Sequence, residues 1–165
     1  SLGFEAFREE ELKNFNKRNT IATNEEAVRI LQSNGIQVWG CFIVDPAWER
    51  RDFDGLLEYL GRLRLSFHQF TVLTPIPGTG FFTEKVQELL TTNYERFDFL
   101  HGVLPPKLPV AEFYENMARL YAFSKLNLAD LRRGWHEGDI TPATLRRLAA
   151  MLQRLANPQA YLAGS

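Results

Sequence analysis

The sequence has little cysteine: Cys41 is the only one among its 165 residues. One thiol excludes an internal disulfide and any metal site that needs several cysteines of this chain, and it favours a reducing compartment. We therefore expect Cys41 to be a small buried apolar residue rather than a nucleophile or ligand. Because the histidines show no metal-ligand spacing either, we assign the chain no metal site and no catalytic residue.

The chain also lacks an excess of charge and a long apolar run. The 19 Lys and Arg residues nearly balance the 20 Asp and Glu residues, whereas a surface that follows nucleic-acid phosphates usually makes a domain basic. No apolar stretch reaches the roughly 18 residues that a membrane-spanning helix needs, and no signal-peptide pattern opens the chain. We expect a cytoplasmic globular protein without a transmembrane segment or a nucleic-acid partner.

Two apolar runs are present, and a helix-sized segment separates them. They cover residues 35–45 and 67–79. Such runs joined by a helix predict a βαβ unit, and parallel strands buried on both faces are near-continuously apolar, as Val38–Val44 and Phe67–Leu73 are. The predicted fold class is therefore α/β, with two or three parallel strands including a strand stub at Leu2–Glu5. Ligands in such folds bind at the carboxyl ends of the strands.

Within the second run, alternation predicts that Gln69, Thr71 and Leu73 share one side of the sheet. Asp45 follows the first run, where it either caps a turn or contacts a ligand; we favour the turn. In Pro75–Thr79, proline fixes the chain exit, Gly78 supplies an unusual backbone angle and Thr79 caps the next segment of the chain.

Helical periodicity dominates the rest of the chain. We expect Asn24 to cap a helix that ends at Ser33, Asp52 or Asp54 to cap the helix between the two runs, and Thr83 to cap the next one. Helices are also predicted after Pro109 and Pro142. The chain accordingly divides into an α/β part over residues 1–92 and a helical extension over residues 93–165.

Several motifs follow one another in an order that resembles a known family. They are Gly3-Phe4-Glu5, an Asn-Lys pair that ends at Lys17, a Gly-Ile-Gln-Val-Trp-Gly-Cys-Phe-Ile strand from Gly35, and Thr-Pro-Ile-Pro-Gly-Thr from Thr74. This order is similar to the later part of the barrel of cobalamin-dependent radical SAM enzymes, and most similar to methylases associated with hopanoid synthesis. The resemblance covers roughly Leu2–Tyr121 and implies a partial TIM-like barrel.

The resemblance implies a parent enzyme that cleaves S-adenosylmethionine at a 4Fe-4S cluster and transfers a methyl group through cobalamin to an unactivated carbon, with a hopanoid lipid as one candidate substrate. The three-cysteine cluster motif is absent here. We therefore expect a fragment that is inactive alone, binds none of these cofactors by itself and has the N-terminal remainder of the parent as its partner. The opening at Ser1, followed at once by a strand-like segment, also predicts a piece of a longer protein.

The resemblance further implies cofactor-binding residues. By analogy, Glu5 contacts the ribose or amino group of the cofactor, and Lys17 is a candidate partner for its carboxylate. Adenosine packing would involve Gly40 together with Phe42 and Val44, with Leu73 against the adenine; for Gly40, tight helix packing is an equally good explanation.

Three further expectations concern assembly, location and function. An incomplete barrel leaves a strand edge and a lumen wall uncovered, which predicts a homodimer of the isolated fragment. A lipid substrate would allow association with the membrane surface. A non-catalytic α/β scaffold for protein interaction is the alternative function.

Overall fold

The computed structural model describes residues 1–15, 17–65, 67–125, 141–155 and 157. Two compact units, Ser1–Pro105 and Pro106–Ser165, divide the chain, and each is described by itself. The predicted division after residue 92 concerns the limits of the barrel segment and stays a prediction.

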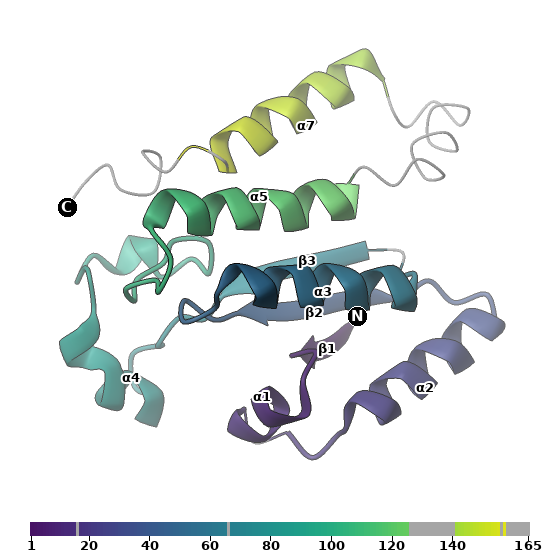
Figure 1. Cartoon of the computed structure of the whole chain (residues 1–165), viewed down its shortest axis with the longest axis horizontal. Helices are drawn as coiled ribbons and strands as arrows, with labels where there is room; N and C mark the ends of the chain where they lie inside the picture. Colours follow the sequence, from purple (N-terminus) through teal and green to yellow (C-terminus); the bar gives the residue numbers. More distant parts are fainter. Residues whose placement is uncertain (16, 66, 126–140, 156, 158–165) are drawn as a thin grey trace. The chain divides into compact units, whose positions relative to one another are not determined.

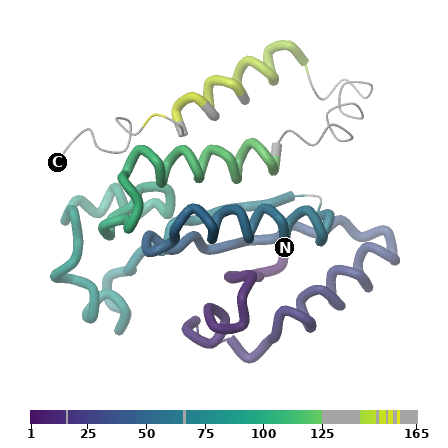
Figure 2. The backbone as a smooth tube through the Cα atoms, in the orientation of Figure 1, coloured from purple at the N-terminus to yellow at the C-terminus, as the bar shows by residue number. Residues whose placement is uncertain are grey.

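The first unit is an α/β layer in which β1, β2 and β3 form one parallel sheet in that order (Figure 1). The predicted βαβ arrangement and α/β class are confirmed. In chain order the elements are β1 (Leu2–Glu5), α1 (Glu9–Asn14), α2 (Ile21–Ser33), β2 (Trp39–Val44), α3 (Arg50–Leu63), β3 (Phe67–Val72), α4 (Gly80–Lys85) and the 3-10 turns η1 (Val86–Glu88) and η2 (Tyr94–Arg96). The chain forms α1 and α2 between β1 and β2, and α3 between β2 and β3; Figure 2 traces this path.

One face of the sheet is closed. Phe4, Phe42 and Phe70 lie on it as neighbours, with ring centroids 5.1 Å apart for the first pair and 6.2 Å for the second. Helix α3 contributes its apolar side to this core, and Tyr59 contacts the Phe42 ring edge-on at 6.4 Å. We call this side the closed face. Leu2 on it is half-buried, and its other strand residues are buried: Phe4, Gly40, Phe42, Val44, His68, Phe70 and Val72.

The opposite side is the open face. It carries Gly3, Trp39, Cys41, Ile43, Phe67, Gln69 and Thr71, which are exposed or half-buried. Gln69 and Thr71 therefore share a side as predicted, but the expected burial of both faces is wrong for the described residues. The sequence suggested burial on both faces because the open face also carries apolar residues, namely Trp39, Ile43 and Phe67. Trp39 and Phe67 are nevertheless 47% and 46% exposed.

Three predicted helix starts are corrected. Helix α2 begins earlier than expected, because the Oγ1 of Thr20, not Asn24, accepts the cap hydrogen bond from the Thr23 N–H. Helix α3 begins after Glu49, and the predicted cap Asp52 instead closes a capping box by accepting from the Glu49 N–H at 2.6 Å. Helix α4 begins just after Thr79, one turn before the expected cap at Thr83.

The Pro75–Thr79 segment has the geometry that its composition predicts. Gly78 has a φ of +87°, and the Thr79 N–H donates to the Ile76 carbonyl at 3.1 Å to close the turn. The Thr79 Oγ1 then accepts from the Phe82 N–H at 3.1 Å, which caps α4. Proline, glycine and threonine thus each have the structural role expected of them.

The second unit contains helices α5 (Val110–Lys125) and α7 (Pro142–Leu155). Both begin where proline predicts a first turn, just after Pro109 and at Pro142. The apolar residues Phe113, Met117 and Leu120 of α5 repeat at helical spacing and are buried. The predicted helical character of this part is confirmed within the described ranges.

Candidate functional site

The carboxyl end of β1 has an unusual backbone. Glu5 has a φ of 63°, and the Ala6 N–H donates to the Phe4 carbonyl at 2.7 Å, which makes a γ-turn centred on Glu5. A shift in the pairing with β2 lies at the same place, between Gly3 and Glu5. Glutamate rarely adopts positive φ, because its Cβ then crowds the backbone, so this strand end is held in a strained form.

This turn directs the Glu5 carboxylate over Gly3 on the open face. A Cβ placed on Gly3 would lie 2.7 Å from the Glu5 Oε1, so only glycine leaves room for the carboxylate there. The Lys17 Nζ donates to the same oxygen at 3.0 Å. The Gly-x-Glu spacing thus has a direct structural meaning: the glycine accommodates the side chain of the glutamate two residues later.

The carboxyl ends of β2 and β3 stay aligned beyond the last strand residues. The Leu73 N–H donates to the Val44 carbonyl at 2.9 Å. Asp45 follows Val44, and its Oδ1 accepts from the Ala47 N–H at 2.8 Å, which confirms its predicted turn-capping role. The two strand tips therefore hold Asp45 and Leu73 next to each other.

A pocket of about 440 Å³ opens at these tips. Carboxylates, aromatic rings and aliphatic groups line it: Glu11, Asn14, Phe15, Ile43, Asp45, Trp48, Leu73 and Phe81. A second hollow of about 210 Å³ shares Asp45, Leu73 and Phe81 with it and adds Lys85 and Glu88 at its polar end. The pocket lies at the carboxyl ends of the strands, where ligands of α/β folds bind. Ligand binding at this place stays a prediction.

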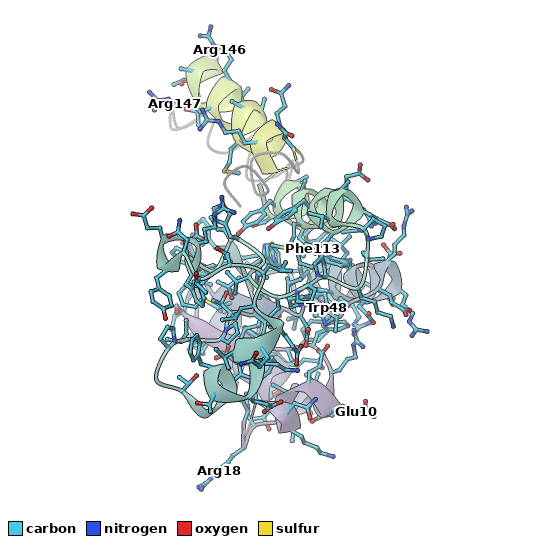
Figure 3. All side chains as sticks on the ribbon, turned by 90° about the vertical axis from the view of Figure 1, so that its left-hand side faces the viewer. Glu10, Arg18, Trp48, Phe113, Arg146 and Arg147 are labelled. Carbon is cyan, nitrogen blue, oxygen red and sulfur yellow. The ribbon has the colours of Figure 1, made fainter. Side chains whose placement is uncertain are left out.

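Glu11 of α1 is the least satisfied polar group of the pocket. Its Oε1 accepts from the Trp48 indole Nε1–H at 3.0 Å and lies 3.6 Å from the Arg8 Nη2. Its Oε2 is buried and has no hydrogen-bond partner, and the side chain as a whole is 19% exposed. In Figure 3, Trp48 lies inside its unit, whereas Glu10, which precedes Glu11 in the chain, points outward.

The burial of Glu11 changes the pKa of its carboxyl group. Desolvation raises the pKa of the Glu11 carboxyl above its ordinary value of 4.5, and it outweighs the opposing effects of Arg8 and of the Trp48 hydrogen bond. Repulsion from Asp45 and Asp52 adds to the rise. Arg8 is engaged elsewhere, since its Nη2 donates to the Asp52 Oδ1 at 2.7 Å.

The structure distributes the predicted cofactor-binding residues over three places. Glu5 and Lys17 form the ion pair on the open face, and Leu73 lines the strand-end pocket. Phe42 and Val44 are fully buried on the closed face, so their placement gives them a packing role, and adenosine contact by them stays a prediction.

Gly40 also lies on the closed face, and neighbouring side chains account for it. A Cβ on Gly40 would meet the Leu65 Cδ1 at 2.5 Å and the Phe42 ring at 3.0 Å. These contacts are side-chain packing, but not the helix packing that the sequence offered as one explanation, because Leu65 follows α3 and Phe42 lies on β2. Adenosine contact at Gly40 stays a prediction. Cys41 is half-buried, not fully buried as expected, and its Sγ–H points to the Gln69 Oε1 at 3.9 Å.

Sequence reasoning did not find Glu11, Trp48 or Phe81. Trp48 follows the strand-end turn at Asp45 by three residues, a position that could have indicated a pocket wall. Glu11 has no comparable signal, because its role depends on a contact with Trp48 across 37 positions of sequence.

Among the residues that the structure describes, no group of three or more His, Cys, Asp or Glu side chains is arranged to bind a metal ion. In the same ranges, every helix is too short or too polar to cross a membrane.

Fold and site together define a segment of an α/β protein with a pocket at the strand tips. Comparison with known proteins identifies its relatives. The chain is 36% identical over 118 residues to hopanoid C-3 methylase of Methylococcus capsulatus, a match that covers 72% of this chain and 23% of that protein. It is 32% identical over 124 residues to bacteriochlorophyllide d C-12(1)-methyltransferase of Chlorobaculum tepidum, covering 73% and 27%.

A third relative is the anaerobic magnesium-protoporphyrin IX monomethyl ester cyclase of Cereibacter sphaeroides, 31% identical over 111 residues, 65% of this chain and 18% of that protein. No protein-family profile matches the chain. The chain is homologous to the C-terminal part of radical SAM enzymes of the hopanoid C-3 methylase type, which confirms the resemblance drawn from its motifs. It spans about a quarter or less of the length of the three relatives named here.

Proposed function

We propose that this chain is the C-terminal part of the barrel of a cobalamin-dependent radical SAM methyltransferase, and that its strand tips bind the nucleoside of S-adenosylmethionine. The observation that carries the proposal is the Glu5 site. There a strained backbone and a glycine without Cβ together present a carboxylate on the open face, and strain of this kind collects at functional sites. A carboxylate can accept two hydroxyl hydrogen bonds, which suits a ribose.

Lys17 has a positioning role in this proposal. Its ammonium group donates to the Glu5 Oε1 at 3.0 Å and so holds the carboxylate in place on the open face. Leu73, at the mouth of the pocket, supplies an apolar surface against the adenine. These residues suit the nucleoside part of S-adenosylmethionine.

The iron-sulfur cluster does not fit the residues of this chain. Three thiolates are needed at the cluster motif of the resembling family, and Cys41 is the only cysteine. The N-terminal remainder of the parent would therefore supply the cluster and the cobalamin, and its strands would cover the open face. In the described residues, the outer edge of β1 has no strand neighbour, so it offers a place for such a strand to pair.

The reaction proposed for the parent is methyl transfer to an unactivated carbon. The names of two relatives support methyl transfer, one of them to a hopanoid. A hopanoid or similar lipid is therefore the substrate class that we propose. Such an enzyme would work in the cytoplasm and contact the membrane surface to reach its substrate.

The test uses the full-length protein that contains this chain. A Cys-x3-Cys-x2-Cys motif upstream of Ser1 is expected in its gene, and its absence would favour the non-catalytic scaffold instead. In the reconstituted enzyme, Glu5→Gln should lower the rate of S-adenosylmethionine cleavage at least about tenfold, mainly through a raised KM, because a neutral amide is a weaker acceptor for hydroxyls. The control is Glu10→Gln, an exposed carboxylate of α1. Equal rates for the two variants would refute the role of Glu5.

The same uncovered β1 edge leads us to propose a homodimer for the isolated 165-residue chain. Light scattering should give twice the chain mass of 19.0 kDa. A monodisperse monomer would contradict this proposal and leave the nucleoside site unaffected.

A further inference from the structure

We infer that helix α7 binds the surface of a membrane that contains anionic lipids, through its arginine side chains and the apolar side chains beside them. The inference goes beyond the proposed function, which does not say which element of the chain would contact a membrane or which lipids would attract it. It depends on three features of α7: its charge, the state of its arginines and the exposure of its apolar residues.

The charge of α7 has one sign. The helix comprises 14 residues, among them Arg146, Arg147 and Arg154, and its sequence contains no aspartate or glutamate. The unit that carries it, Pro106–Ser165, has eight Lys and Arg and five Asp and Glu residues, whereas Ser1–Pro105 has 11 and 15. A basic unit in a chain whose net charge is -1 is suited to an anionic partner.

The arginines of α7 are accessible to such a partner. All three are exposed, and in Figure 3 the Arg146 and Arg147 side chains extend outward from the helix. The Arg146 Nε donates to the Pro142 carbonyl of its own helix at 3.3 Å. Within the described part of the chain, none of the three arginines forms an ion pair. Their charges are therefore not neutralised by a neighbouring carboxylate there.

Exposed apolar side chains lie beside these arginines and favour a lipid over a nucleic acid. Helix α7 is amphipathic, and its Leu145 and Met151 are 38% and 36% exposed. Leu145 directly precedes Arg146, and Met151 follows Arg147 by four residues, about one helical turn. At a membrane surface, arginine reaches the headgroups while neighbouring apolar groups contact the acyl chains. Nucleic-acid phosphates would use only the arginines.

The length of α7 suits a helix that lies on a membrane. A spanning helix needs about 20 mostly apolar residues, whereas α7 has 14. In its unit α7 lies along α5 (Figure 1), yet every α7 side chain whose burial the structure describes is exposed. Because a helix of this length is marginal in water without packing of its apolar side, contact with a lipid surface would also stabilise it.

The experiment measures how the 165-residue chain partitions onto sedimented vesicles. Vesicles of phosphatidylcholine alone are compared with vesicles that also contain phosphatidylglycerol. One arginine near an anionic surface changes the affinity roughly fivefold, so three arginines should give a preference of at least about tenfold for the anionic vesicles. The preference should shrink as the salt concentration rises. Equal binding to both kinds of vesicle, or binding to neither, would overturn the inference.

Two triple variants then assign the preference to α7. In Arg146→Gln/Arg147→Gln/Arg154→Gln, the preference for anionic vesicles should be lost. The control removes the same net charge from three exposed arginines of Ser1–Pro105 and should keep the preference. Its arginines are each paired with a carboxylate, at 2.6, 3.0 and 3.4 Å: Arg29→Gln/Arg51→Gln/Arg62→Gln, whose partners are Glu26, Glu49 and Glu58. Equal losses in the two triple variants would show that only net charge matters and would also overturn the inference.

A second measurement, which needs no variant, locates the contact. The chain has two methionines, Met117 buried in α5 and Met151 exposed in α7. With methyl-labelled methionine and anionic bicelles that contain a nitroxide-bearing lipid, the Met151 methyl resonance should broaden and that of Met117 should persist. Broadening of neither resonance, or of both equally, would contradict contact through α7.

Competition decides between the two anionic partners. A duplex oligonucleotide, added at the same phosphate concentration as the anionic vesicles, should leave the chain on the vesicles. Its release would identify nucleic acid as the preferred partner and overturn the inference. None of these measurements uses S-adenosylmethionine or the cluster, so their failure would leave the proposed nucleoside site untouched.

Discussion

The closed and open faces of the sheet are built from the same three strands but differ in what their side chains do. On the closed face, stacked rings and α3 exclude water, and even a glycine is fixed by its neighbours. On the open face, Glu5 adopts a strained backbone, Cys41 and Gln69 are partly solvated, and the pocket lies at the tips. Stability is therefore concentrated on one side of the strands, which leaves the other free for binding.

The largest expected effect comes from a matched pair of phenylalanines. Phe42→Ala on the closed face should lower the free energy of unfolding by about 3–5 kcal/mol, because a fully buried ring leaves a cavity. Phe67→Ala on the open face removes a ring that is 46% exposed and contacts Trp39 at 5.9 Å, so about 1 kcal/mol is expected. Denaturant unfolding measures both; equal losses would show that the faces do not differ.

A pair of glycines gives a smaller effect with opposite signs. Gly40→Ala should destabilise by about 1–3 kcal/mol, because the new methyl group would overlap Leu65. Gly61→Ala, on the exposed side of α3 with no atom within 4 Å of the added Cβ, should stabilise by about 0.5–1 kcal/mol through helix propensity. The measurement is the shift in thermal midpoint. Stabilisation by Gly40→Ala would contradict the packing explanation and favour a position kept open for a ligand.

The smallest effect concerns Glu11 and depends on pH. Because burial raises the pKa of Glu11 in the folded state above 4.5, the unfolded state ionises more readily, and the charged group destabilises the fold above that raised pKa. Glu11→Gln should therefore raise the thermal midpoint at neutral pH. The gain should shrink as pH falls through the raised pKa and vanish below 4.5, where the carboxyl is protonated in both states.

Glu10→Gln is the control for this measurement. It changes the same charge on an exposed side chain and should alter stability by less than about 0.5 kcal/mol. The expectation is contradicted if the thermal midpoint of Glu11→Gln lies below that of the unaltered chain at every pH. The hydrogen bond from Trp48 would then contribute more to stability than the buried charge costs.

Local patterns predicted the sheet and its connections well. The two apolar runs, the turn at Gly78 and the helix starts near proline depend on residues close in sequence, so composition was sufficient to find them. It was harder to predict from the sequence which side of the sheet is covered. Phe42 and Leu73 are both apolar and belong to the two apolar runs, but only the fold shows that α3 covers the first and leaves the second at a pocket.

Contacts between distant segments set the remaining features. The side chain of Leu65, 25 positions further along the chain, fills the space where a Cβ on Gly40 would lie. Of the three consecutive glutamates of α1, Glu11 is the one that accepts the hydrogen bond from Trp48. The Thr20 cap of α2 could have been predicted, since threonine is a favoured N-cap residue, but asparagine is favoured as well and Asn24 lies one turn later. Propensity alone does not distinguish two nearby capping residues.

The buried oxygen of Glu11 also has a consequence for protein engineering. If the ionised carboxylate weakens the fold at neutral pH, a selection that rewards only heat tolerance should replace it early. The selected chains would unfold at higher temperature, yet they would have lost the carboxylate that accepts the Trp48 hydrogen bond at the pocket wall.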